Sequence, residues 1–363
     1  MLHASAPVPG VERIAVLRAN GLGDLIVALP ALEALRAAYP RAEIVLLGAN
    51  WHADFLNGRP GPVDRAIAVP QSHGVNGGED ATEDPARLGT FFAAMEREHF
   101  DLAMQLHGGG RNSNPFLLRL GAKFTVGLRT PDAPPLDRWL PYVISQHEIM
   151  RYLEVAALAG APATTLEPRI ALTVADRVEA ADEIPADGRP LVALHPGASD
   201  PRRRWPPEKF AAVGDRLTQA GAHVVITGVA GERPLTEAVR AAMHADATDL
   251  SGHLSIGGLA ALLARCRVVV SNDSGPMHLA AAVGASTVGI FWCMNLGNYG
   301  PLTCERNRTV VSWRMTCPDC GALEPGPHCG HTSSWVADIG VQDVADRALD
   351  LFYRADAIAN GPG

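Results

Sequence analysis

Short runs of apolar residues recur along the chain, each followed by a turn of small residues and then by a helical pattern. In the first half, residues 13–17 and 43–47 have the pattern of buried strands, and leucines at helical spacing lie between them. Strand, helix and strand at this spacing form a βαβ unit, in which the two strands are parallel. Further strands are predicted at residues 66–69 and 102–106, and irregular segments at residues 71–84 and 131–141.

The same alternation restarts after a turn-rich stretch at residues 185–190. Strands are predicted at residues 191–194, 223–227, 267–270 and 286–291, with helices at residues 209–220 and 276–283. Two successive sets indicate an α/β protein of two Rossmann-like, doubly wound domains facing across a cleft. We assign residues 1–175 to the first domain and 186–340 to the second. The last helix, within residues 341–363, is expected to pack back on the first domain.

The turn at residues 271–278 is the sharpest candidate site. A buried strand runs into Ser-Asn-Asp-Ser-Gly-Pro-Met-His, and the proline suits the first turn of a helix. The first N–H groups of a helix have no partner within it and carry the positive end of its dipole, so they attract phosphate. The alternative is that Asp273 or Ser274 only caps the helix and that His278 is a packed core residue. The predicted diphosphate site comprises Asp273, Ser274, Gly275, Pro276, Met277 and His278.

A second candidate loop begins at His195 and Gly197 and then contains three consecutive arginines, Arg202, Arg203 and Arg204. A guanidinium stays charged and offers a two-pronged match to phosphate. Such a group would stabilise a leaving diphosphate without a metal. A solvated basic loop is the alternative interpretation.

Two carboxylates complete the candidate chemistry. Asp24 ends a glycine turn after the first strand, where it could accept a proton from an acceptor hydroxyl or serve only as a helix N-cap. Glu232 precedes a helix, where it could bind ribose hydroxyls or only complement the helix dipole. The turn at residues 20–24 lacks the full G-x-G-x-x-G spacing, so it predicts no dinucleotide fingerprint.

Three motifs together resemble glycosyltransferase family 9, which is typified by the ADP-heptose:lipopolysaccharide heptosyltransferases. They are Gly-Leu-Gly-Asp at 21–24 with Leu-Pro-Ala-Leu at 29–32, His-Pro-Gly at 195–197 with Arg-Arg-Trp-Pro at 203–206, and the turn at 271–278. The matches follow this order over nearly the whole chain. The resemblance implies a GT-B fold and inverting transfer of a heptose or related sugar from an ADP-sugar to an acceptor hydroxyl, with no cofactor or catalytic metal required.

The resemblance also implies roles for single residues. Asp24 matches the proposed catalytic base, Asp273 matches the aspartate near the donor sugar, and residues 274–277 match the diphosphate-binding turn. Arg203 falls where the family carries a basic residue on the donor phosphates, usually lysine, with Arg204 as the alternative. Glu232 corresponds only loosely to the ribose-binding acid, because its loop differs from the family pattern.

The resemblance implies a glycan, lipid-linked or small-molecule acceptor, recognised by the first domain. Gly23, His107, Arg111 and Asn112 follow predicted strands of that domain and are candidate acceptor-side residues. A purely structural glycine-rich loop is an equal alternative. We expect few exposed basic residues in this domain, which weakens the case for a highly phosphorylated lipopolysaccharide acceptor.

Charge and composition narrow the choice of partner and compartment. A formal net charge of −8 argues against bulk binding of nucleic acid, which needs a basic surface. The first residues lack the long apolar core of a secretory signal, and the apolar runs are too short to span a bilayer. We expect a cytoplasmic enzyme, with peripheral contact at the inner face of the membrane left open for a lipid-linked acceptor.

Cysteine and histidine gather near the end of the chain at Cys317, Cys320, His328, Cys329 and His331. A C-x-x-C pair with nearby cysteine and histidine suits tetrahedral Zn²⁺. We predict no catalytic metal. Reduced thiols or a disulfide rank ahead of a structural zinc bound by Cys317, Cys320, Cys329 and His331.

Two other functions stay open at this point. One is a GT-B epimerase or hydrolase that acts on a nucleotide sugar with water, and the other is a non-catalytic protein that binds a nucleotide sugar. Donor turnover measured with and without an acceptor separates the three.

Overall fold

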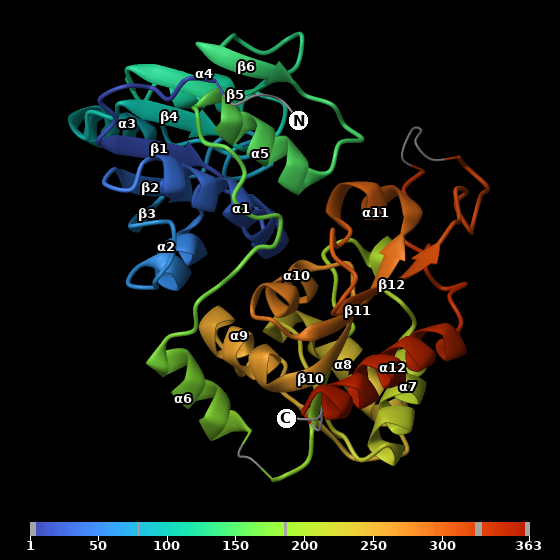
Figure 1. Ribbon diagram of the computed structural model, residues 1–363. Helices are drawn as coiled ribbons and strands as arrows, with labels where there is room; N and C mark the ends of the chain where they lie inside the picture. The colour runs from blue at the N-terminus through green and yellow to red at the C-terminus, as the bar shows by residue number, and fades with distance from the viewer. Residues whose placement is uncertain (1–4, 79, 185–186, 324–328, 360–363) are drawn as a thin grey trace. The chain divides into compact units, whose positions relative to one another are not determined.

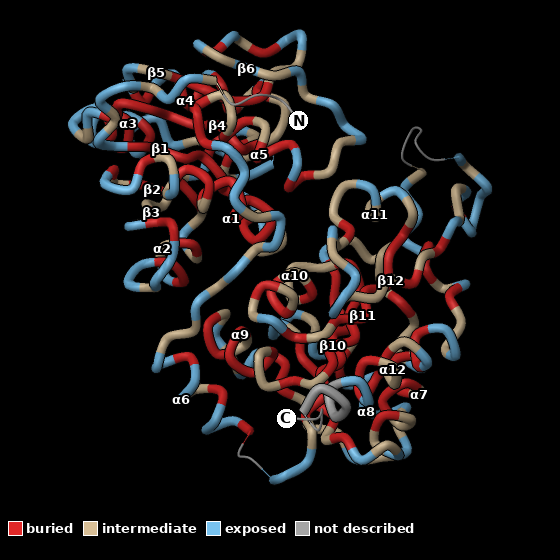
Figure 2. Tube along the Cα trace, in the orientation of Figure 1, coloured by how far each residue is buried: buried red, intermediate tan, exposed pale blue. Residues whose placement is uncertain are grey.

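The computed structural model describes residues 5–78, 80–184, 187–323 and 329–359. The chain divides into two compact units, Met1–Ala171 and Leu172–Gly363. Each unit is built on one parallel sheet of six strands with helices packed against it (Figure 1). The central strands β1, β4, β7 and β10 are buried almost throughout, which explains their nearly continuous apolar sequence. Figure 2 shows this for β1, β4 and β10.

The sheet of the first unit has the strand order β3-β2-β1-β4-β5-β6. Its strands are β1 Arg13–Leu17, β2 Glu43–Gly48, β3 Arg65–Ala68, β4 Leu102–Gln105, β5 Phe124–Arg129 and β6 Arg138–Pro141. Its helices are α1 Leu22–Ala38, α2 Asn50–Leu56, α3 Pro85–Arg97, α4 Ser113–Leu118 and α5 Glu148–Leu158. The four strands predicted for this half are confirmed to within one residue or two at their ends.

The start of α1 corrects one expectation. The helix begins at Leu22 with Gly21 as its N-cap residue, so Asp24 is the third helical residue and not the N-cap. The Oδ2 atom of Asp24 accepts a hydrogen bond from the N–H of Gly21 at 3.1 Å. A side chain at the third helical position can accept a hydrogen bond from the N-cap residue, which stabilises the first turn. Helix α1 therefore starts three residues earlier than expected.

Strand β6 was not expected, because residues 131–141 contain four prolines and read as irregular. The strand lies at the edge of the sheet and pairs with β5. Proline lacks an N–H donor, and an edge position tolerates that loss because the outer side of the strand needs no ladder hydrogen bond.

The sheet of the second unit has the order β12-β11-β10-β7-β8-β9. Its strands are β7 Leu191–His195, β8 His223–Ile226, β9 Ala247–Asp249, β10 Cys266–Asn272, β11 Ser286–Trp292 and β12 Asn307–Ser312. Its helices are α6 Val174–Glu183, α7 Pro207–Gln219, α8 Arg233–Ala242, α9 Ile256–Arg265, α10 Gly275–Ala282, α11 Cys293–Tyr299 and α12 Val341–Ala359.

Helices α6 and α12 fix the extent of the second unit. Helix α6 packs on α9, and the Glu179 carboxylate accepts hydrogen bonds from the N–H and hydroxyl of Ser255. The second unit therefore starts before the turn-rich stretch at residues 185–190. Helix α12 packs on α7 and β10, and its Val344, Ala348 and Phe352 lie in the second core. The described part of the last helix is thus built into the core of the second unit.

Both sheets have the same topology. In each, the first strand lies between the second and the fourth, so the winding reverses between β1 and β4 and again between β7 and β10. In open parallel sheets, ligands bind beyond the carboxyl ends of the strands at this switch point. Asp24 and His107 follow β1 and β4, and the two candidate phosphate loops follow β7 and β10.

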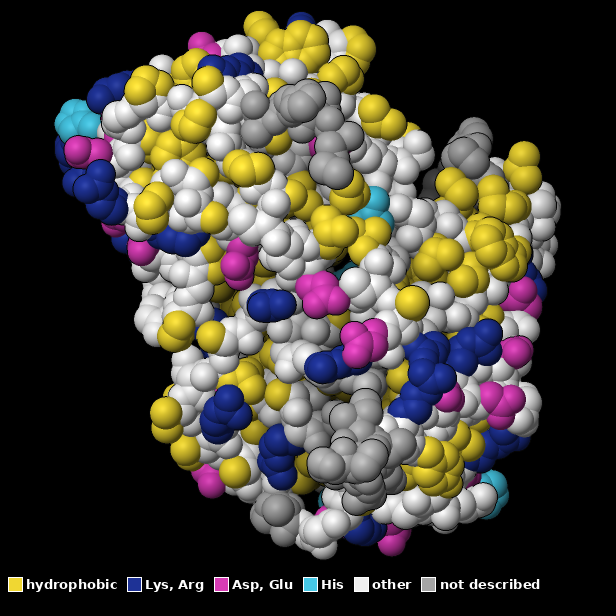
Figure 3. All heavy atoms as spheres, in the orientation of Figure 1, with side chains coloured by type: hydrophobic (Ala, Val, Ile, Leu, Met, Phe, Trp, Pro, Cys, Tyr) yellow, Lys and Arg dark blue, Asp and Glu magenta, His cyan; other side chains and the backbone are white. Residues whose placement is uncertain are grey.

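The sequence has a low share of charged residues, and the distribution of charged side chains on the surface agrees with it. Acidic and basic side chains lie interspersed on the face seen in Figure 3. Within the described residues, every helix is too short or too polar to cross a lipid bilayer.

Two histidines are buried among the described residues of the first unit. His52 is fully buried, and its Nδ1 accepts a hydrogen bond from the N–H of Ala49 at 2.9 Å. Burial lowers the pKa of His52 to about 4. Burial also lowers the pKa of His107 to about 4. Both imidazoles are therefore neutral at pH 7 in the folded chain.

Acid should therefore weaken the first unit. An unfolded histidine takes up a proton near pH 6.5, whereas folded His52 resists protonation until about pH 4. The stability that His52 contributes is complete above pH 6.5 and falls by about 3 kcal/mol as the pH drops to 4. We expect His52→Asn, which retains an acceptor for Ala49, to flatten this loss in urea unfolding at pH 7 and pH 4.5.

The control is His99→Asn, because His99 is exposed and its positive φ suits asparagine. This variant should keep the wild-type pH dependence. An equally steep loss of stability in His52→Asn would contradict the account.

Candidate active site

Two loops at the carboxyl edge of the second sheet meet through one ion pair. Arg203, on the loop after β7, donates from Nη1 to the Oδ2 of Asp273 at 3.2 Å and to its carbonyl oxygen at 3.3 Å. The Nη2 of Arg203 donates to the hydroxyl of Ser199 at 2.8 Å. Strands β7 and β10 are adjacent in the sheet, so their loops leave it side by side. The geometry brings together two residues that lie 70 positions apart in sequence.

Asp273 is the buried centre of this arrangement, with 1% of its surface exposed. Asn295 of α11 donates to its Oδ2 at 2.7 Å, and the Nε2 of His278 lies 3.6 Å from its Oδ1. Burial alone would raise the pKa of Asp273, but the contacts with His278, Asn295 and Arg203 outweigh burial and lower it. The carboxylate is therefore charged at pH 7 and held in one orientation.

Asn272 locks the two loops together one residue earlier. Its side-chain oxygen accepts from the N–H of Trp205 at 3.0 Å, and its amide donates to the carbonyl of Pro196 at 2.7 Å. Asn272 and Trp205 are both fully buried. One side chain thus fixes both ends of the arginine loop to the end of β10.

The start of α10 corrects the capping alternative. Ser274 is the N-cap residue, yet no side chain caps this helix among the described residues, and the hydroxyl of Ser274 instead lies 3.2 Å from that of Ser271. The side chain of Asp273 turns to Arg203. Pro276 lies in the first turn as predicted, and Met277 is buried. Gly275 opens the helix, so its N-terminus faces the charged pair without a protein cap.

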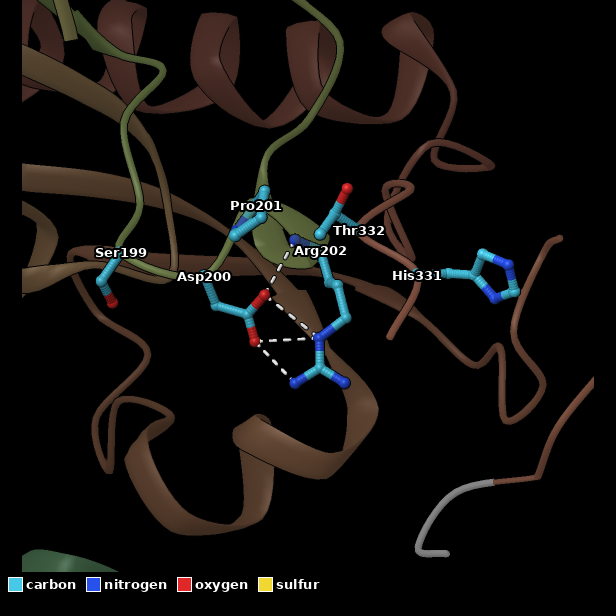
Figure 4. A pocket seen from close by; sticks show the side chains of 6 residues that line it. All are labelled: Ser199, Asp200, Pro201, Arg202, His331 and Thr332. Carbon is cyan, nitrogen blue, oxygen red and sulfur yellow. Dashed lines mark hydrogen bonds and ion pairs between the residues drawn. The ribbon is translucent and has the colours of Figure 1, made fainter. Parts of the chain in front are cut away.

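Arg202 and Arg204, the other two arginines of this loop, make hydrogen bonds to other groups. Arg202 donates two hydrogen bonds to the Oδ2 of Asp200 (Figure 4). Its Nε lies 3.0 Å from that oxygen, and its Nη2 lies 2.7 Å from it. Arg204 donates from Nε to the carbonyl of Ala198 at 2.9 Å. Arg203 is the arginine of the three that reaches the turn after β10, which favours it over Arg204 as the candidate phosphate ligand.

Gly197 and Glu232 lie against each other. A Cβ atom on Gly197 would come 2.2 Å from the Oε1 of Glu232, so a larger residue here would displace this carboxylate. Glu232 also accepts a hydrogen bond from the N–H of Val229 at 3.0 Å. His195 is buried with its Nδ1 3.1 Å from the hydroxyl of Thr227, and burial, opposed by the charge of Glu232, lowers its pKa. His195 is thus a neutral group beneath the loop.

Asp24 lies in the first unit beside Arg18. The Nη2 of Arg18 donates to its Oδ1 at 2.6 Å, and the Nε of Arg18 donates to its carbonyl oxygen at 3.2 Å. Arg18 is almost completely buried, and its Nη1 also donates to the carbonyl of Leu106 after β4. The carboxylate is therefore held by a fixed cation at the switch point, with about a quarter of its surface exposed (24%).

The candidate acceptor-side residues share this edge of the first sheet but differ in exposure. His107 is buried, its Nδ1 accepts from Ala19 at 3.2 Å, and its Nε2 lies 3.1 Å from the carbonyl of Gly74. Arg111 is exposed and lies 3.6 Å from Asp132. Asn112 precedes α4, and Gly23 lies in the first turn of α1. His107 therefore joins two segments of the unit, whereas Arg111 is accessible.

Three of these residues were missed from the sequence. Arg18 directly follows a buried strand, and Asn295 follows β11, so both carried the signal of a polar residue at a strand's carboxyl end. Asn272 lay inside the predicted turn but received no role. A search for polar residues after every strand would have found all three.

The fold and the site define a class of protein. Two Rossmann-like units, each with a loop site at its switch point, form the GT-B fold. A family 9 glycosyltransferase from Veillonella parvula has this fold, with a TM-score of 0.78, 22% identity, and 97% of this chain and 99% of that chain covered. The ADP-heptose heptosyltransferase II of Escherichia coli has it too, with a TM-score of 0.73, 21% identity and coverage of 95% and 100%.

The family follows from the sequence comparison. The model of glycosyltransferase family 9 (heptosyltransferase) matches residues 89–322. Lipopolysaccharide heptosyltransferase 2 of Salmonella typhimurium is 26% identical over 298 residues, which cover 77% of this chain and 82% of that protein. The chain belongs to glycosyltransferase family 9, and it is a glycosyltransferase.

The lock at Asn272 can be tested with an isosteric change. Asn272→Asp should cost about 3 kcal/mol at pH 7, because a carboxylate oxygen would face the carbonyl of Pro196 in place of the amide donor. The loss relative to wild type should shrink at pH 5, where a protonated carboxyl can donate to that carbonyl. Chemical denaturation at both pH values measures the difference.

The control is Asn57→Asp, since Asn57 makes the same two-sided contact with Ala66 at an exposed position. It should cost less than half as much. An equal effect at the two positions would mean that burial of Asn272 contributes nothing.

Proposed function

We propose that this chain is an inverting heptosyltransferase that takes an ADP-activated heptose and transfers it to a hydroxyl of a cell-envelope glycan. The observation that carries the proposal is the Arg203–Asp273 pair at the N-terminus of α10, on the switch point of the second sheet. Such a position combines a fixed guanidinium with helix N–H groups that favour a diphosphate.

The donor is inferred from chemistry and from relatives together. Arg203 and the turn at residues 274–277 supply the charge and donors for a diphosphate, and Asp273 is the candidate contact for the sugar. Glu232, beside Gly197, is the candidate for the ribose hydroxyls, with His195 supporting the loop from below. The relative from Escherichia coli is named for ADP-heptose, which supports ADP over other nucleotides as the carrier.

Asp24 is the proposed general base. Its carboxylate would take the proton of the acceptor hydroxyl as that oxygen attacks the anomeric carbon and the bond to the diphosphate breaks. The negative charge that develops on the leaving ADP would be met by Arg203 and by the start of α10. Arg18 would keep the carboxylate of Asp24 in place during the reaction.

The acceptor is inferred from the names of relatives. The protein from Salmonella typhimurium is a lipopolysaccharide heptosyltransferase, which favours a sugar of the lipopolysaccharide core. Arg111, Asn112 and Gly23 are the candidate contacts, with His107 as their buried support. Such an acceptor is lipid-linked, so the reaction would take place at the inner face of the membrane.

The arginine assignment gives a direct comparison. Arg203→Ala should weaken ADP binding by roughly tenfold to hundredfold, because a charge-assisted contact with phosphate is worth about 1.5–3 kcal/mol. Arg204→Ala should stay within about threefold of wild type, since its Nε is bound to Ala198. Titration calorimetry with ADP measures both affinities. A larger loss in Arg204→Ala than in Arg203→Ala would reverse the assignment.

The role of Asp24 is tested by separating transfer from donor binding. Asp24→Asn should lower the rate of sugar transfer about 10²–10⁴-fold, as expected for removal of a general base. ADP affinity should be unchanged, because the proposed phosphate ligands belong to the second unit. Asp54→Asn, an exposed change in the same unit, is the control. Equal loss of transfer and ADP binding would contradict the assignment.

A further inference from the structure

We propose that Cys317, Cys320, Cys329 and His331 bind one Zn²⁺ ion in a structural site that holds residues 313–323 and 329–340 together. The three sulfurs and one ring nitrogen all lie within 4.8 Å of one another. The Sγ of Cys317 lies 3.7 Å from the Nδ1 of His331. Zinc–ligand distances of about 2.1–2.3 Å place tetrahedral ligand atoms about 3.5–3.8 Å apart, so the arrangement is close to a zinc site before any ion enters.

The backbone around Cys317 and Cys320 forms a tight turn, which brings the two side chains close together. The N–H of Cys317 donates to the carbonyl of Ala322 at 2.8 Å, and the N–H of Gly321 donates back to Cys317 at 2.9 Å. Gly321 has a φ of +73°, which lets the chain turn sharply after the second cysteine.

The second ligand pair has a similar turn. Gly330, between Cys329 and His331, has a φ of +78°. This left-handed residue allows side chains two positions apart to converge on one point. A pair of glycines in this conformation, one beside each ligand pair, accounts for how ligands from two separate turns meet.

The composition of the cluster separates zinc from its alternatives. A disulfide would use two of the three sulfurs and leave one sulfur and an imidazole beside it without a role, and all six cysteines are unpaired. Hard cations such as Mg²⁺ and Ca²⁺ prefer oxygen ligands, whereas three thiolates and an imidazole in a tetrahedron suit a thiophilic metal, and Cys₃His is a ligand set of structural Zn²⁺. Four protein ligands close the coordination sphere, which is the pattern of a structural site and not of a catalytic one.

The position of the cluster indicates what the ion would hold in place. Cys317 is packed into the core of the second unit, and residues 313–323 contain only one isolated bridge, between Thr316 and Leu323. Farther along, the N–H of Trp335 donates to the carbonyl of Arg202 at 2.8 Å, and its carbonyl accepts from the hydroxyl of Ser312. The segment thus rests against the arginine loop with few regular hydrogen bonds of its own.

A pocket of about 390 Å³ lies at this contact (Figure 4). One wall is formed by Ser199, Asp200, Pro201 and Arg202, and the other by His331 and Thr332. The ring of His331 points away from Arg202. Zinc bound to that ring would fix the second wall, so the ion would support the shape of the pocket without entering it.

Metal content tests the proposal without reference to activity. Protein purified without chelators should contain about one Zn²⁺ per chain by plasma mass spectrometry. Cys320→Ser, at an exposed position, should retain less than roughly a tenth of that amount. Cys304→Ser, an exposed cysteine outside the cluster, should retain the wild-type content. His331→Gln repeats the test with the nitrogen ligand.

A cobalt spectrum tests the geometry in the unaltered sequence, so the result does not depend on how a variant folds. Replacement of the metal by Co²⁺ should give intense visible bands of a tetrahedral site and near-ultraviolet thiolate-to-cobalt bands. Metal-free wild-type protein after incubation with Zn²⁺ would overturn the proposal. Iron in place of zinc, full zinc content in Cys320→Ser, or a disulfide between Cys317 and Cys320 in the native protein would each overturn it as well.

Discussion

The charge of Asp273 is the constraint on which the candidate site depends. A carboxylate with 1% of its surface exposed is costly to bury unless cations and donors surround it. Arg203, His278 and Asn295 meet that need, and they come from the loop after β7, from α10 and from α11. Satisfying one buried charge therefore fixes three separate segments at the carboxyl edge of the sheet.

The same constraint explains why the arginine loop can serve a ligand. Asn272 holds the loop at Pro196 and at Trp205, and the Asp273 contact holds Arg203 between these points. A guanidinium that is already oriented loses little freedom when phosphate arrives, so more of its interaction energy is available for binding. The first unit also has a charged pair held in place at its switch point. Buried Arg18 orients Asp24 there and donates a hydrogen bond to the carbonyl of Leu106.

The sequence predicted what is local and periodic. The eight predicted strands, the turn at residues 271–278 and the loop of arginines depend on neighbours in sequence, and they lie where the pattern placed them, whereas β5, β9 and β12 were not predicted. Arg18, Asn272 and Asn295 gained their roles from contacts across strands, which periodicity does not encode. The start of α1 was placed too late because the side chain of Asp24 reaches back to Gly21. Strand β6 was missed because the prolines of residues 131–141 predicted an irregular segment, and Pro141 is acceptable in a strand only at a sheet edge. The convergence of Cys329 and His331 on the C-x-x-C turn was not predicted, because spacing alone does not show which turns meet in space.

The central claim is that the turn after β10 and Arg203 together hold the diphosphate of the donor. A crystal structure of the protein with bound ADP tests this claim most directly. The account predicts the β-phosphate within hydrogen-bond distance of the Arg203 guanidinium and of N–H groups in the first turn of α10. Phosphates bound at the turn of residues 20–24, or held by Arg204 with Arg203 still paired only to Asp273, would contradict it.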